Sequence, residues 1–158
     1  MAREKEIIWL LLSWVISFAV FLILLGVANV IKNNSTNQVL IQSVNFLNTN
    51  VFSLILIGIL FLIGSIFMLL MFPFDLPGPL FSATGGFMLS NFIFKIFALI
   101  NSLLAEKVFD MLISLSNYVS LIIFVLVLLI GYIDILVRNF RPKREERVKD
   151  KGREKRRK

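Results

Sequence analysis

The sequence lacks two residue types on which much enzyme chemistry depends, because none of its 158 residues is cysteine or histidine. Without cysteine there can be no disulfide bond, thiolate metal site or cysteine nucleophile. Without histidine there is no imidazole base, no histidine metal ligand and no Ser/His/Asp arrangement. These absences leave an enzyme only Asp, Glu, Lys, Tyr and Ser to work with, so an enzymatic function is disfavoured and we expect no metal or cofactor.

Charge is also scarce over most of the chain, since only 17% of residues are charged while 58% are hydrophobic and the mean hydropathy is +0.85. Soluble domains contain about 45–50% apolar residues. Twelve of the 17 Lys and Arg residues fall at or after Arg138, so the net charge of +7 belongs to the C-terminal end. This pattern predicts an all-α, polytopic integral membrane domain over residues 1–137 and a basic, disordered cytoplasmic tail over residues 138–158.

Long apolar runs define the expected membrane spans. A transmembrane helix needs about 20 mainly apolar residues. Segments that meet this length predict four spans, at about residues 7–31, 51–72, 80–105 and 118–137. The first run is longer than the core of a signal peptide, so we expect it to be retained as a membrane anchor.

The third segment is ambiguous because Lys95 lies almost at its centre, between Asn91 and Asn101. The gain from its apolar residues, roughly 5 kcal/mol, is nearly cancelled by roughly 3 kcal/mol for one central Lys and by the asparagines. The basic tail places the C-terminus in the cytoplasm, and Arg3 and Lys5 favour the same side for the N-terminus. We therefore predict four spans in the cell membrane with both termini cytoplasmic; the alternative is three spans plus an interfacial amphipathic helix.

The connection over residues 32–50 is expected outside the cell, as a loop that turns back through an amphipathic segment into the second span. It carries two overlapping glycosylation sequons, at Asn33 and Asn34. The alternative is a polar loop that matches the sequon by chance.

A polar stripe is predicted along the third segment, because several polar residues share about one quadrant if the helix continues unbroken. The candidate site residues within it are Asn91, Lys95, Ser102 and Glu106, and the stripe extends to Thr84, Asp110 and Asn117. The stripe could line a path for anions or small solutes, or it could simply orient the helix in a bundle. Since Glu106 is about 16 Å from Lys95 along the axis, any partner of Lys95 must come from another helix or chain.

Small residues four apart mark expected packing faces for other membrane helices, from the same chain or another. They are Ser13 with Ser17, Ser82 with Gly86 and Ser90, and Ser116 with Ser120. The basic tail is expected to contact anionic lipid head groups. Its candidate contact residues are Lys143, Arg144, Arg147, Arg156 and Arg157. RNA or the ribosome, and an acidic protein, are the alternative partners of the tail.

The proline-rich interruption "MFPFDLPGPLFSATGG", residues 71–86, holds a lone carboxylate, Asp75. We interpret it as a hinge between the second and third spans, with Asp75 at the membrane interface and with Ser82 or Thr84 capping the next helix. Two functions remain open for the whole chain. The first is an accessory or assembly subunit that acts through helix–helix contacts and the tail; the second is an oligomeric pore former or small transporter with the Lys95 stripe lining the path.

Overall fold

The computed structural model describes residues 2–70, 73–104 and 108–140, and within these ranges every regular element is a helix. The helices are α1 (Ala2–Asn33), α2 (Gln38–Leu69), α3 (Pro77–Leu104), α4 (Asp110–Ser114) and α5 (Ser116–Phe140). The predicted all-α class is confirmed. Four of the helices, all except α4, are long and apolar enough to cross a membrane. The basic tail after Phe140 lies outside the described residues.

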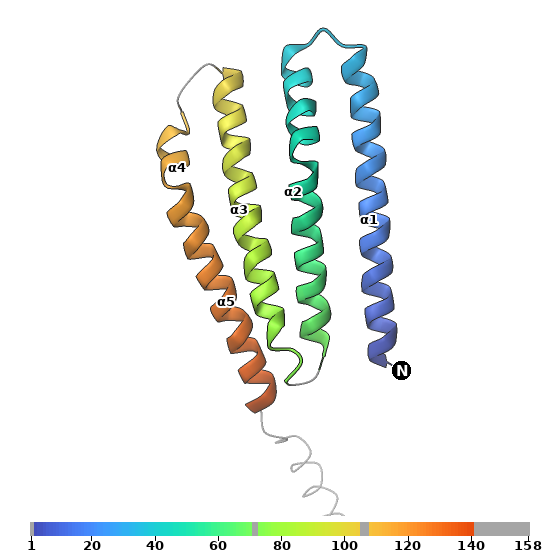
Figure 1. Ribbon diagram of the computed structural model, residues 1–158, viewed down its shortest axis with the longest axis vertical. Helices are drawn as coiled ribbons and strands as arrows, with labels where there is room; N and C mark the ends of the chain where they lie inside the picture. The colour runs from blue at the N-terminus through green and yellow to red at the C-terminus, as the bar shows by residue number, and fades with distance from the viewer. Residues whose placement is uncertain (1, 71–72, 105–107, 141–158) are drawn as a thin grey trace, which may run out of the picture.

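The four long helices form a single antiparallel row in the order α1, α2, α3, α5 (Figure 1). Within the described residues, α1 packs only against α2, and α5 packs against α3 and the short α4. The helix α3 lies lengthwise between α2 and α5, whereas an interfacial amphipathic helix would lie across one end of the others. The molecule is therefore an open layer of helices, with α1 and α5 at its two edges.

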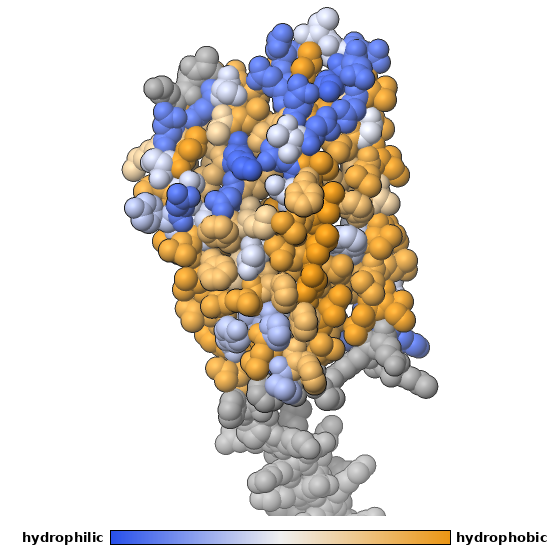
Figure 2. Space-filling model, viewed as in Figure 1, coloured by the Kyte–Doolittle hydropathy of each residue, from blue (hydrophilic) through white to orange (hydrophobic). Residues whose placement is uncertain are grey.

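Apolar side chains cover most of the face of this layer that Figure 2 shows. The buried hydrophobic residues are few: Val44, Ile57, Ala83, Phe92 and Ile135. No residue of α1 between positions 5 and 33 is buried. Soluble monomers rarely expose apolar patches larger than a few hundred Å². The exposed apolar surface and the four long helices together indicate a membrane protein.

The connection between the first two long helices is much shorter than expected. We predicted a loop over residues 32–50, but α1 continues to Asn33 and α2 begins at Gln38. The side chain of Asn37 caps α2, because its Oδ1 accepts the backbone N–H groups of Val39 and Leu40 at 2.9 and 3.4 Å. The 32 residues of α2 extend over about 48 Å, which exceeds the roughly 30 Å of a hydrocarbon core. Its polar N-terminal third is helix rather than loop, and Figure 2 shows hydrophilic residues gathered at this end.

The helix α3 also begins earlier than its sequence suggested. We expected Ser82 or Thr84 to cap it, but its first residue is Pro77 and its third is Pro79. Proline is tolerated in the first helical turn because the N–H groups there have no partner within the helix. The two prolines therefore start the helix instead of preceding it.

Close approach of backbones fixes this end of the row. A Cβ atom added to Gly64 of α2 would clash with Oγ of Ser82 and would lie 3.1 Å from the carbonyl oxygen of Gly78, both in α3. A Cβ atom added to Gly131 of α5 would lie 2.6 Å from Cβ of Pro79. Glycine is required at both positions because no side chain fits between the helices.

Candidate functional site

Polar side chains form hydrogen bonds between the helices in a band near the end of the row where α1 connects to α2. Between these two helices, the side-chain amides of Asn29 and Asn48 bond reciprocally, with N–O distances of 3.1 and 2.7 Å. One turn further out, Nζ of Lys32 donates to Oδ1 of Asn45 at 3.2 Å. Each amide thus supplies both a donor and an acceptor to its partner, which satisfies polar groups that would be costly in lipid.

Lys95 belongs to the same band of polar side chains and links α3 to α2. Its Nζ donates to Oδ1 of Asn50 at 3.1 Å, and Nδ2 of Asn50 donates to the carbonyl oxygen of Phe46 at 2.9 Å. The amide of Asn50 is buried, at 7% exposure, while the side chain of Lys95 is exposed. The expectation that a partner of Lys95 must come from another helix agrees with this geometry. This hydrogen bond holds α3 against α2.

Lys95 is central in the third segment of the sequence, but in the structure it lies toward the polar end of the helix row. Its partner Asn50 is the last asparagine of α2 and is followed by a mainly apolar run, and Asn91, one turn away from Lys95, bonds in the opposite direction to α5. There, Oγ of Ser120 donates to Oδ1 of Asn91 at 3.1 Å and lies 3.0 Å from Oγ of Ser90. Asn91 and Lys95 therefore serve two different interfaces of α3.

The predicted polar stripe requires an unbroken helix as far as Asp110 and Asn117, but these two residues belong to the separate helices α4 and α5. Oγ of Ser102 donates to the carbonyl oxygen of Leu99 in its own helix, at 2.7 Å. Glu106 lies outside the described residues. Asp110 starts the separate helix α4, where its Oδ1 accepts a hydrogen bond from Asn101 at 3.0 Å. Residues 108 and 109 form a turn before α4, so Asp110 does not continue the 100° spacing of α3.

The two sequons lie in the tight turn between α1 and α2. Asn33 is the last residue of α1, and both Asn33 and Asn34 are exposed. Nδ2 of Asn34 donates to the carbonyl oxygen of Val30 at 3.0 Å, which holds this side chain against the end of α1. The structure therefore places both side chains at the surface, at the end of the row where hydrophilic residues gather.

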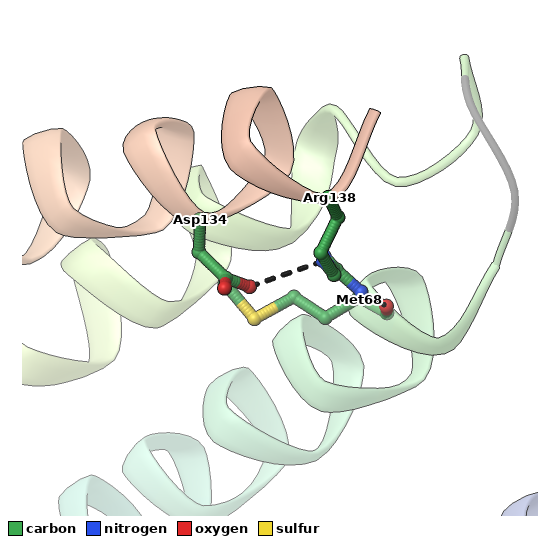
Figure 3. Close-up of polar contacts among 3 residues, drawn as sticks. All are labelled: Met68, Asp134 and Arg138. Atoms are coloured by element: carbon green, nitrogen blue, oxygen red, sulfur yellow. Dashed lines mark hydrogen bonds and ion pairs between the residues drawn. The ribbon is translucent and has the colours of Figure 1, made fainter. Parts of the chain in front are cut away.

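The opposite end of the row holds an ion pair within α5, and the arginine of this pair also bonds to α2 (Figure 3). Nε of Arg138 lies 3.1 Å from Oδ2 of Asp134, which is one turn earlier in α5. In addition, Nη1 of Arg138 donates to the carbonyl oxygen of Met68 at 2.9 Å. This second bond could not be predicted from the sequence, because a backbone acceptor at the end of α2 carries no sequence signature. Arg138 thereby ties the last turn of α5 to the last turn of α2.

The side chain of Asp75, in the turn between α2 and α3, is buried within the protein. Its exposure is only 4%, and its Oδ1 is buried with no hydrogen-bond partner among the described residues. Its carbonyl oxygen accepts the backbone N–H of Gly78 at 3.0 Å, which helps to form the turn into α3. The position of the hinge was predicted, but the burial of its carboxylate was not.

The candidate lipid-contact residues of the tail, at positions 143, 144, 147, 156 and 157, lie outside the described residues. Within the described part of the chain, no three acidic side chains come close enough together to hold a metal ion. Sequence reasoning missed Asn29, Asn48 and Asn50, although asparagine within or beside an apolar helix is itself a signal of an interhelical bond. No protein-family model, curated protein or solved structure matches this chain.

Proposed function

We propose that this protein is a non-enzymatic, four-span subunit of the cell membrane that acts in assembly, through the open faces of its helix row and through its basic tail. The observation that carries the proposal is the row itself. Four helices could pack as a closed bundle in which each contacts two others, yet α1 packs only against α2 within the described residues. Both broad faces and the α1 edge are thus available to other membrane helices.

The proposed orientation places the tail and the start of α1 in the cytoplasm. Four antiparallel helices bring the beginning of α1 and the end of α5 to the same end of the row (Figure 1). Residues 141–158 contain eleven of the 17 basic residues, so this end has the charge expected of the cytoplasmic side. The turn with Asn33 and Asn34 would then face the outside of the cell.

The loose packing of α1 supports a role for this edge in association. The helix leaves a groove of about 290 Å³ against α2, lined in part by Ser13, Ser17, Gly58 and Ser65. Small side chains let a neighbouring helix approach closely in lipid. The stacked rings of Trp14 and Phe18, with centroids 5.4 Å apart, stand beside this groove and add apolar surface.

Photo-crosslinking in the native membrane tests the proposal. A photoreactive residue at Val20, which is 49% exposed on α1, should give an adduct heavier than the 18.1 kDa chain. The same residue at Ile135, which is 3% exposed, is the control and should react only within the chain. An adduct of twice the chain mass indicates self-association, and any other mass indicates a different subunit. If Val20 and other exposed positions on both faces give no adduct, and the purified chain in nanodiscs is monomeric, the proposal fails.

The alternative of a pore former has one observation in its favour, the exposed ammonium group of Lys95. An open row encloses no path, so several copies would be needed, and Asn91 is already bonded to α5. Chloride and small-solute flux into liposomes distinguishes the two functions. Flux that is above the lipid background and is abolished by Lys95→Leu would replace the assembly role with a pore.

A further inference from the structure

The buried carboxylate of Asp75 lacks a partner in the described part of the chain, although charge burial is expensive unless the charge is paired. Its Oδ1 is fully buried without a hydrogen bond. The cations described at this end of the row either bond to other groups or lie on the edge helix. Arg138 bonds to Asp134 and to the Met68 carbonyl, and Lys5 is an exposed residue of the edge helix α1. Neither of these cations therefore pairs with Asp75.

The end of α5 lies close to the turn that contains Asp75. Arg138 bonds the carbonyl oxygen of Met68, while a Cβ atom on Gly78 would lie 2.8 Å from Cγ of the same Met68. Gly78 in turn donates its N–H to the carbonyl oxygen of Asp75. Met68 thus has the end of α5 on one side and the turn of Asp75 on the other.

The tail that follows α5 carries the complementary charge. Residues 1–140 contain six basic and six acidic residues, whereas residues 141–158 contain eleven basic and four acidic ones. Three basic residues, Arg141, Lys143 and Arg144, follow Phe140 directly. An extended chain advances about 3.3–3.6 Å per residue, so residues 141–144 can extend up to about 13–14 Å from the end of α5.

We propose that Asp75 is a docking site for the chain's own basic tail and that it binds one of Arg141, Lys143 and Arg144 through a charge-assisted hydrogen bond. An Arg or Lys donor placed against a buried carboxylate oxygen forms the stronger kind of hydrogen bond. The tail would then be fixed at its root against the α2–α3 turn, and its remaining basic residues would be free for lipid or a partner. This inference does not depend on the proposed assembly function, because the contact lies within one chain.

A nitroxide label on the tail tests this inference, and the cysteine-free chain makes the labelling specific. Val148→Cys is labelled in the full-length protein and studied in nanodiscs of uncharged phosphatidylcholine, which removes anionic lipid as a competitor. The expected spectrum contains a motionally restricted component, and Asp75→Asn should abolish that component. The matched control, Asp134→Asn, should leave it unchanged, since Asp134 is exposed and already paired with Arg138.

A second variant keeps the test valid if Asp75→Asn fails to fold. The full-length protein with Arg141, Lys143 and Arg144 all replaced by Gln leaves every helix residue intact, and it should also lose the restricted component. High salt should affect the wild type little, because 1 M salt reduces the Debye length to about 3 Å and mainly releases exposed charges. Three results would overturn the proposal: a label equally mobile in wild type and Asp75→Asn, equal release by Asp134→Asn, or a label still restricted in the Gln variant.

Discussion

The contact between Gly131 of α5 and Pro79 of α3 predicts that one added methyl group should push these helices apart. A Cβ atom at position 131 would lie 2.6, 2.9 and 3.3 Å from Cβ, Cγ and Cα of Pro79. Ordinary carbon–carbon contacts are about 3.5–4.0 Å. The proline ring cannot rotate away, because it is part of the backbone. Relief of the clash must therefore come from movement of a helix.

The magnitude of this effect follows from two opposing contributions. Forced overpacking of a tight contact destabilises by roughly 1–3 kcal/mol. Replacement of Gly by Ala within a helix favours the helix by about 1 kcal/mol. Gly131→Ala is therefore expected to lower the free energy of unfolding by up to about 2 kcal/mol, the difference between these contributions.

Two other glycines provide matched controls. A Cβ atom on Gly26 of α1 meets nothing within 4 Å, so Gly26→Ala gains the helix term without a clash. A Cβ atom on Gly86 of α3 faces α5 at ordinary distances, 3.6 Å from Val127 and 3.8 Å from Ile123. Gly86→Ala should therefore be tolerated, although it alters the same interface as Gly131→Ala.

The assay is reversible unfolding by sodium dodecyl sulfate in mixed micelles, followed by far-UV circular dichroism. Because all three variants gain the same helix propensity, the difference between Gly131→Ala and the two controls isolates the clash with Pro79. We expect that difference to be roughly 1–3 kcal/mol. If Gly131→Ala is as stable as Gly26→Ala and Gly86→Ala, the close approach of α3 and α5 does not exist as described.

Three further experiments test the polar contacts in the same unfolding assay. Ser120→Ala removes a fully buried hydroxyl and leaves its partners unpaired, so it should cost about 1–3 kcal/mol, whereas Ser17→Ala, which removes an exposed hydroxyl bonded only to its own helix, should be neutral. A double-mutant cycle of Lys95→Leu with Asn50→Leu should give a coupling of about 0.6–1.7 kcal/mol, and strictly additive losses would contradict the bond between them. Asp134→Asn should change the stability by no more than about 0.5 kcal/mol, since exposed pairs one turn apart contribute little; a loss above about 1 kcal/mol would show that this pair matters more.

The sequence alone predicted the helices because helix formation in an apolar segment depends on local and additive properties. Runs of about 20 apolar residues satisfy their backbone hydrogen bonds only as helices when they lie in lipid. Each of the four predicted segments overlaps one long helix, and the Asp134–Arg138 pair forms because residues four apart meet on any helix. The positions of helix ends were less accurate, as Pro77 at the start of α3 shows.

Only the tertiary structure decided which polar groups meet, because that depends on the alignment of residues far apart in the chain. Lys95 bonds to Asn50 only because α2 and α3 run antiparallel with these two residues at the same height. The bond from Arg138 to the Met68 carbonyl and the burial of Asp75 have the same origin. Hydropathy is a property of each segment by itself, whereas the open row and its buried carboxylate arise from how the segments pack.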